Sequence, residues 1–319
     1  MEASSESGLR SGFAEVRHAS FAEFEMGGPV MVKVRNCRAD ALGANGRMAV
    51  KVKPASRGIV ARQVDERTVE FALQRPEFLS VEFNGERKQN LHVFANAMLT
   101  ETYTGDEPGT INWTAPNAQD IFMQDARLIY FGPGVHKPKD LPSGEIKIPS
   151  HTTVYLAPGA VVRARLIVDR AEDVRIIGRG IIAHPLRGIE ITYSKDVLVD
   201  GVTVLNPQHY TVYGGQSENI TIRNLKSFSA RPWSDGIDLM CCRHVKIHNV
   251  FLRNSDDCIA FTTTVGGIGE EVVTLTFRGP LCGATGRIRS ISGRMATIVA
   301  RPARHWKTCA YTIVTSFSM

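Results

Sequence analysis

Four stretches in the second half of the chain repeat one phrase: D-V-R-I-I-G-R-G-I-I (173–182), D-V-L-V-D-G-V-T-V-L-N (196–206), N-I-T-I-R-N-L-K-S-F (219–228) and H-V-K-I-H-N-V-F-L-R-N (244–254). The first apolar residues of these phrases are spaced by 23, 23 and 25 positions: Val174, Val197, Ile220 and Val245. A fixed period of this length is typical of a stacked architecture. Because each phrase holds short β-rich runs and no helical periodicity, the pattern predicts a right-handed parallel β-helix.

One position of the repeat is always glycine or asparagine: Gly178, Gly201, Asn224 and Asn249. Both residue types tolerate a positive φ angle, so this position is expected to form a corner of each coil. The runs T-V-Y-L-A-P-G-A-V-V from Thr153 and L-I-Y-F-G-P-G-V-H from Leu128 predict two earlier coils. A leucine-rich repeat is the alternative, but the phrases lack its regular leucines.

The first half of the chain contains short β-rich runs between Pro29 and Asn96, separated by turn formers such as Asn84-Gly85. Several runs alternate apolar and polar residues, which predicts a β-sandwich ahead of the β-helix. The expected class is therefore all-β. The predicted parts are an N-terminal extension, the β-sandwich, a connector rich in turn residues, the β-helix and an atypical basic tail: residues 1–28, 29–99, 100–126, 127–277 and 278–319.

The positive charge of the chain is confined to its tail. The formal net charge is +6, but residues 272–319 contain six arginines, one lysine and no acid, which leaves 31 basic against 32 acidic residues elsewhere. A nucleic-acid or membrane partner is therefore not expected. The tail has lost the phase of the repeat, and two interpretations stand: a truncated or frame-shifted reading, or a divergent cap that covers the open end of the β-helix.

Sequence signals for the compartment are few. No run approaches the ~20 apolar residues of a membrane span. The first ten residues lack the basic start, apolar run and small-residue cleavage site of a secretory signal. Six cysteines without paired spacing do not form a disulfide framework. We expect a cytoplasmic protein, or a secreted one if a leader is missing from this sequence; the oligomeric state stays open.

Two acidic motifs lie within the repeats, S-D-G-I-D (234–238) and S-D-D-C-I-A (255–260). Aligning them gives an offset of 22, about one coil, so Asp235, Asp256 and Asp257 are expected on neighbouring strands ~4.8 Å apart. Like charges this close raise at least one pKa, which provides an acid beside a base, as glycosidic bond cleavage requires. Two other interpretations remain, namely solvated surface acids and a calcium site.

The paired motifs resemble the N-T-D-G and Q-D-D-C signature of glycoside hydrolase family 28, the polygalacturonases. The resemblance implies hydrolysis of α-glycosidic bonds in a pectin-type polysaccharide or oligosaccharide, with inversion and without a metal or organic cofactor. It implies that Asp256 is the general acid, while Asp235 and Asp257 activate the attacking water. The segment 206–210 resembles the N-S-P-x-W segment of that family, which lines the sugar-binding surface.

Further residues are expected to bind substrate. Aromatic faces stack on sugar rings and arginine pairs with carboxylates, so the expected contacts come from five side chains: His209, Tyr210, Arg231, Trp233 and Asp238. The sandwich ahead of the β-helix resembles that of glycoside hydrolase family 49, the dextranases. The stretch N-G-E-R-K-Q-N-L-H-V-F-A-N (84–96) is similar to the sandwich of bacterial proteins that join the two features.

The chain also departs from family 28. The G-H-G motif is absent, since no histidine occurs between His248 and His305. R-I-R-S-I-S-G (287–293) arrives too early to replace the R-I-K motif, and Trp233 stands where asparagine is usual. In the family those basic residues bind a uronate carboxylate. The alternatives are therefore a dextranase-like hydrolase of neutral α-glucan, an inactive or carbohydrate-binding remnant, and a pectate lyase.

Overall fold

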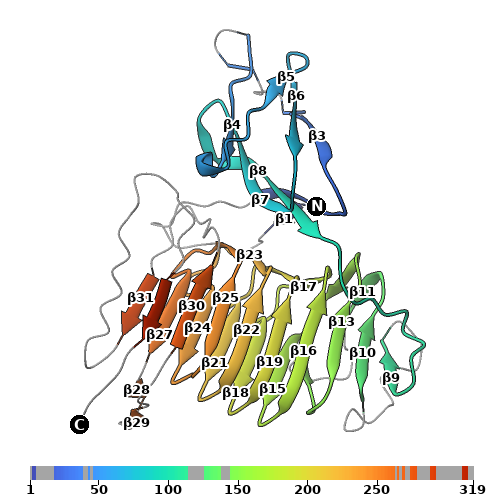
Figure 1. Cartoon of the computed structure of the whole chain (residues 1–319), viewed down its shortest axis with the longest axis vertical. Helices are drawn as coiled ribbons and strands as arrows, with labels where there is room; N and C mark the ends of the chain where they lie inside the picture. Colours follow the sequence, from blue (N-terminus) through green and yellow to red (C-terminus); the bar gives the residue numbers. More distant parts are fainter. Residues whose placement is uncertain are drawn as a thin grey trace. The chain divides into compact units, whose positions relative to one another are not determined.

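The computed structural model describes residues 2–4, 18–38, 42–43, 46–113, 126–137 and 144–262, together with five strands further along the chain. These residues fall into two compact units, one up to Thr100 and one from Glu101 onward. Both units are built from strands, as the sequence predicts (Figure 1). No helix in the described residues is long and apolar enough to cross a membrane.

The N-terminal unit contains two sheets. The larger has the order β1 (Glu2–Ser4), β2 (His18–Met26), β8 (Glu86–Ala97), β7 (Glu77–Phe83), β4 (Val50–Lys53). The smaller has the order β3 (Val30–Arg35), β6 (Thr68–Leu73), β5 (Arg62–Gln63), and a short 3-10 helix, η1 (Ala55–Arg57), follows β4. Phe71 of the smaller sheet and Val81 and Val93 of the larger belong to one buried apolar cluster, so the two sheets pack as a sandwich.

The larger sheet begins earlier in the chain than the sequence indicates. β2 lies within the residues expected to form an N-terminal extension, yet it pairs in parallel with β8, with Ser20 opposite Leu91. Its first residues alternate in burial, since Ala19 and Phe21 are buried and Ser20 is exposed. That alternation spans too few residues to stand out in the sequence.

The C-terminal unit is a parallel β-helix built from three long sheets, which confirms the predicted architecture. The first sheet contains β9 (Thr110–Asn112), β10 (Leu128–Phe131), β13 (Thr153–Leu156), β16 (Glu172–Gly178), β19 (Lys195–Asp200), β22 (Glu218–Arg223), β25 (Val245–His248), β30 (Thr274–Arg278) and β32 (Tyr311–Val314). The second contains β11 (Gly134–His136), β14 (Ala160–Val162), β17 (Ile181–Ala183), β20 (Thr203–Leu205), β23 (Lys226–Phe228) and β26 (Phe251–Arg253). The third contains β12 (Glu145–Lys147), β15 (Arg165–Asp169), β18 (Ile189–Thr192), β21 (Val212–Gly215), β24 (Ile237–Met240), β27 (Ile259–Thr262) and β31 (Ile288–Ile291).

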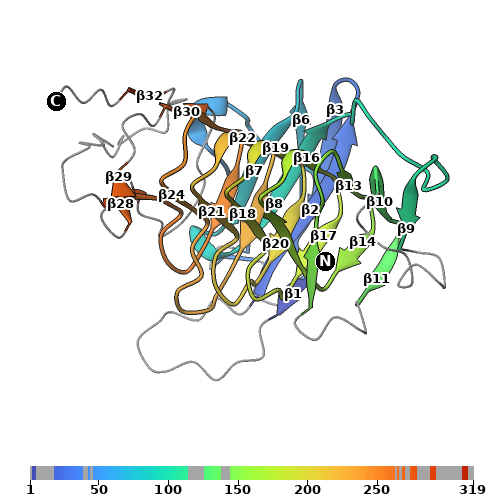
Figure 2. The same cartoon turned by 90° about the horizontal axis from the view of Figure 1, so that it is seen from below.

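Each coil contributes one strand to each sheet, and the coils lie side by side in chain order (Figure 2). Their registers stack aliphatic residues on one another in the interior. One such column of the third sheet is fully buried: Leu166, Ile189, Val212, Ile237 and Ile259. Burying each of these side chains contributes ~1.5–3 kcal/mol, so the repeated apolar positions hold the coils together.

The corner after the first sheet has the conformation that the repeat predicts. Gly178, Gly201, Asn224 and Asn249 all have a positive φ angle, from 51° to 127°. A Cβ atom at Gly178 would lie 2.1 Å from the carbonyl oxygen of Leu156, so only glycine fits there. Further along, the amide of Asn249 donates to Oδ1 of Asn224 at 2.7 Å, which links successive coils.

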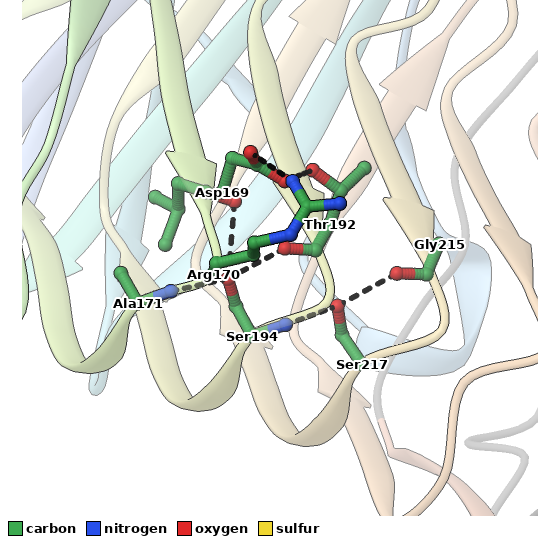
Figure 3. Close-up of polar contacts among 8 residues, drawn as sticks. Asp169, Arg170, Ala171, Thr192, Ser194, Gly215 and Ser217 are labelled. Carbon is green, nitrogen blue, oxygen red and sulfur yellow. Dashed lines mark hydrogen bonds and ion pairs between the residues drawn. The ribbon is translucent and has the colours of Figure 1, made fainter.

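A second corner, between the third and first sheets, is linked by serine hydroxyls (Figure 3). The backbone N–H of Ala171 donates to Oγ of Ser194 at 3.1 Å, and that of Ser194 donates to Oγ of Ser217 at 3.0 Å. Oγ of Ser217 in turn donates to the carbonyl of Gly215 at 2.9 Å. These serines pair backbone groups that would otherwise be buried without partners at the turn.

Two strands of the β-helix, β9 and β31, lie outside the residues expected to form it. β9 lies in the expected connector and pairs in parallel with β10. β30 lies at the end of the expected β-helix and pairs in parallel with β25. β31 lies in the expected tail, yet it continues the third sheet beside β27, with Ile288 opposite Ile259. Strand β32 pairs antiparallel with β30, and β28 (Thr264–Val265) pairs antiparallel with β29 (Ile268–Gly269). Most of the remaining tail lies outside the described residues.

Candidate active site

The acidic motifs lie at the corner where the second sheet leads into the third. Here four residues from successive coils fall in one line: Arg187, Tyr210, Asp235 and Asp257. The line is set by a ladder of backbone hydrogen bonds: Gly188 N–H to Tyr210 O (3.1 Å), Thr211 N–H to Asp235 O (2.9 Å) and Gly236 N–H to Asp257 O (2.8 Å). The pairing of Ile237 with Ile259 confirms the one-coil alignment of the two motifs.

A second line runs parallel to the first on the third sheet. Register places Glu190, Tyr213, Asp238 and Ala260 opposite one another on β18, β21, β24 and β27. Within this line Asp238 is only 6% exposed, whereas Tyr213 is half-buried. The two lines together place an arginine, two tyrosines and the acidic motifs on four consecutive coils.

Gly236 allows the two acidic motifs to approach each other. A Cβ atom at this position would lie 2.1 Å from the carbonyl oxygen of Cys258, a distance that no side chain tolerates. The neighbouring Cys258 is buried, and burial raises the pKa of its thiol to about 11, so it is a packing residue rather than a nucleophile.

Asn254 organises the backbone beneath the acids. Its side-chain Nδ2 lies 3.1 Å from the carbonyl oxygen of Asp235, and at 3.1–3.2 Å from three hydroxyls: Thr211, Ser227 and Ser229. Ser234 lies directly before Asp235, and its hydroxyl donates to the carbonyls of Pro207 and His209 on the preceding coil. This network joins three coils and fixes the position from which Asp235 projects.

The aspartates perturb one another strongly. Burial, with the negative charges of the other aspartates, raises the pKa of Asp235 to about 6 and that of Asp238 to about 8. Asp238 and Asp235 form a side-chain hydrogen bond, which lowers the pKa of Asp235 and raises that of Asp238. The pair therefore shares a proton near neutral pH, with Asp238 as the donor.

The charges of Asp256 and Asp257 contribute to both of these shifts, so all four carboxyl groups lie together. Asp257 is buried, whereas Asp256 and Asp235 are half-buried. An assembly of carboxyl groups with separated proton affinities provides a proton donor and a proton acceptor at one place. Among the residues that the structure describes, no group of histidines, cysteines and acids is arranged to hold a metal ion.

An aromatic surface adjoins the acids on the preceding coil. The rings of Tyr210 and Tyr213 stack with their centroids 5.6 Å apart and an interplanar angle of 19°. The guanidinium of Arg187 lies over both rings, 5.6 and 5.0 Å from their centroids. Burial and the charges of Asp238 and Asp235 raise the pKa of Tyr210, which places this hydroxyl beside the acids.

The other predicted binding residues differ in position. The ring of His209 packs against Tyr210 at 4.0 Å, and burial together with the charge of Arg187 lowers its pKa. Trp233 is 72% exposed and has a φ of 60°, so it projects from the turn before β24. Arg231 is half-buried, and its charge acts on His184, which lies two coils before it.

Arg187 is the residue that the sequence reasoning missed. Its position follows from the repeat, because it precedes Tyr210 by 23 residues, the spacing of the neighbouring coils. It also forms an ion pair with Glu190 at 3.3 Å, which fixes the guanidinium over the two rings.

The segment that carries the acids is similar to known glycosyl hydrolases. The model of Glycosyl hydrolases family 28 matches residues 178–283. A polygalacturonase of Chamaecyparis obtusa is 32% identical over 97 residues, which are 30% of this chain and 18% of that protein. An Aspergillus fumigatus protein named probable endo-xylogalacturonan hydrolase A is 32% identical over 93 residues, 27% of this chain and 23% of that protein.

Among solved structures, Dex49A from Penicillium minioluteum is similar with a TM-score of 0.49 and 15% identity, over 77% of this chain and 59% of that one. The curated relatives are matched over less than a quarter of their own length. All four clustered aspartates fall within the matched residues. The segment 178–283 thus matches the family of polygalacturonase-like glycosyl hydrolases, family 28.

Proposed function

We propose that this chain is an inverting glycoside hydrolase that cleaves α-glycosidic bonds in a pectin-type polysaccharide or oligosaccharide. The observation that carries the proposal is the clustering of four carboxyl groups, those of Asp235, Asp238, Asp256 and Asp257, whose charges act on one another. Hydrolysis of a glycosidic bond needs one carboxyl that donates a proton and another that accepts one.

In the proposed reaction, Asp256 protonates the glycosidic oxygen as the bond to the anomeric carbon breaks. A water molecule attacks that carbon from the opposite face and gives its proton to Asp235 or Asp257. The anomeric configuration is inverted because the water enters opposite the leaving group. Asp238, which is buried and shares a proton with Asp235, acts as a positioning residue that sets the proton affinity of Asp235.

Two observations support a pectin-type substrate. The relatives of the matched segment include proteins named polygalacturonase and endo-xylogalacturonan hydrolase. Arg187 presents a positive charge beside the stacked tyrosines, on the coil that precedes the acids by two steps. A sugar ring stacked on the tyrosines would place its carboxylate within reach of a cation.

The test is a substrate screen with matched variants. Purified protein is incubated with polygalacturonate, xylogalacturonan, dextran and pullulan, and new reducing ends are measured. We expect release from a galacturonan, an inverted anomer in the first NMR spectra, and a loss of at least ~100-fold in Asp256→Asn. Asp106→Asn, which changes an exposed aspartate, is the control.

Three results would overturn the proposal. Cleavage of dextran or pullulan alone would identify a neutral glucan as the substrate. An unsaturated product that absorbs in the ultraviolet would identify a lyase. Tight binding of galacturonan without any turnover would identify a carbohydrate-binding protein.

A further inference from the structure

A group of basic side chains lies at the acid-bearing corner, on the coil that carries Asp235 and on the coils before it. His184 directly follows β17, Arg163 directly follows β14, and Arg231 lies in the turn between β23 and β24. The three belong to different coils, yet they are close enough in space for their charges to interact. Burial, followed by the positive charges of Arg163 and Arg231, lowers the pKa of His184.

The backbone register relates the position of Arg231 to that of His184. In register, His184 is followed by Asn206 and then by Ser229, because the N–H of His184 donates to Leu205 O and that of Asn206 donates to Phe228 O. Arg231 comes two residues after Ser229, so its charge acts across two strand spacings, ~10 Å. Arg231 and His184 therefore lie at the same corner, two coils apart.

Within the part of the chain that the structure describes, these basic groups have no acidic partner. Among the described residues neither Arg163 nor Arg231 forms an ion pair, in contrast to Arg165 and Arg187, which both pair with Glu190. The Nε atom of Arg231 is buried and has no hydrogen-bond acceptor, although a buried donor without a partner costs ~1–3 kcal/mol.

A second unpaired donor lies between them. The side chain of Asn206 is 5% exposed, and its Nδ2 atom is buried without an acceptor. Its other terminal atom, Oδ1, accepts the N–H of Ala230 at 3.4 Å, which places Asn206 beside the turn that carries Arg231. Unpaired donors and unpaired positive charges at one corner are the complement of an anionic acceptor.

We propose that Arg231, with Arg163, His184 and Asn206, forms a subsite that binds the carboxylate of a uronic acid residue in the substrate. A carboxylate offers two acceptor oxygens, and a guanidinium presents parallel donors that match them. The subsite extends from the turn that also holds Asp235 over the three coils before it. This corner would thus recognise the anionic substrate in a chain that lacks the R-I-K motif at its expected position.

This inference rests on the proposed function for its substrate, but its test measures binding and is independent of turnover. The probes are an unesterified oligogalacturonate and its fully methyl-esterified form, which has the same rings without the charge. Dissociation constants are measured by titration calorimetry on the full chain, for the wild type, Arg231→Gln and Arg127→Gln. Arg127 is an exposed arginine just before β10, on the first sheet rather than at the proposed subsite.

We expect Arg231→Gln to weaken binding of the unesterified probe by ~10–100-fold, the strength of a charge-assisted hydrogen bond. Binding of the esterified probe should stay within about twofold, and Arg231→Lys should restore part of the lost affinity. Arg127→Gln should bind both probes as the wild type does. The salt dependence of binding should also become weaker in Arg231→Gln.

Equal losses for both probes would show that Arg231 has only a structural role and would overturn the subsite. An unchanged affinity for the unesterified probe would overturn it as well. If the chain binds the charged probe through Arg231 but releases no reducing ends, the subsite stands and the proposed hydrolysis fails. If hydrolysis proceeds while Arg231→Gln discriminates the two probes as the wild type does, hydrolysis stands and the subsite fails.

Discussion

Replacing Asp238 by asparagine is expected to change the pH dependence of stability in a defined direction. The pKa of this carboxyl is about 8 in the folded chain, against an ordinary value of 3.8, because burial and the charge of Asp235 disfavour its ionised form. A group whose pKa is raised by folding stabilises the fold fully below its unfolded pKa. That stability is lost as the pH rises from about 4 through 8.

The magnitude follows from the same pair of values. For an isolated group, this difference in pKa corresponds to ~4 kcal/mol of unfolding free energy lost between pH 4 and pH 7. Because Asp235 shares the proton, we expect roughly half, ~2 kcal/mol, to be specific to Asp238. Asparagine has the same shape, stays neutral at every pH and retains an N–H donor toward Asp235, so the variant should not lose this stability.

The assay is thermal unfolding followed by circular dichroism at pH 4 and pH 8. With ~2–4 °C per kcal/mol for a large domain, Asp238→Asn should melt ~4–8 °C above the wild type at pH 8 and within ~1 °C of it at pH 4. The exposed Asp106→Asn should follow the wild type at both values. A variant that melts below the wild type at pH 8, or by an equal difference at both pH values, would refute the shared-proton pair.

Three further outcomes are expected. Gly236→Ala should abolish hydrolysis and lower the melting temperature, because its Cβ would lie 2.1 Å from the carbonyl oxygen of Cys258. The control Gly28→Ala, whose Cβ meets nothing within 4 Å, should melt as the wild type does. Equal melting temperatures for the two variants would contradict the close approach at Gly236. Asn254→Ala should destabilise the β-helix by ~2–4 kcal/mol in urea unfolding, because it removes the amide that lies within 3.2 Å of four oxygens, and a loss under ~0.5 kcal/mol would show that the network is dispensable. The kcat/KM for a galacturonan should rise with pH through about 6 as Asp235 ionises and becomes a base, and a profile that is flat between pH 4.5 and 7 would remove Asp235 from that role.

The β-helix and the pairing of its acidic motifs were predictable because both depend on the period of the repeat. Once Val174 and Val197 define the coil length, the register of Asp235 with Asp257 follows by counting, and the ladder of hydrogen bonds confirms it. The apolar interior fixes this count, since a shift of one residue would turn every buried side chain outward.

Side chains in the turns were harder to place. Trp233 is 72% exposed on a turn that no neighbouring coil matches in length, and its predicted contact with sugar stays a prediction. The burial of Asp238 and its hydrogen bond to Asp235 depend on how the chain bends at Gly236, which the repeat does not encode. The roles of the predicted site residues stay predictions until the variants are assayed.

The serine corner of Figure 3 and the acid-bearing corner differ in how much the length of the turn varies from coil to coil. This difference bears on how such a protein evolves. Between β15 and β22 the chain passes the serine corner within two residues on each of three coils, at 170–171, 193–194 and 216–217. At the acid-bearing corner the intervals differ, spanning 184–188, 206–211, 229–236 and 254–258. Residues gained or lost on that edge leave the pitch of the stack unchanged, because the hydroxyls opposite reset each coil. Mutation can therefore remodel the acid-bearing edge while the frame stays the same, as variable loops do on other rigid scaffolds.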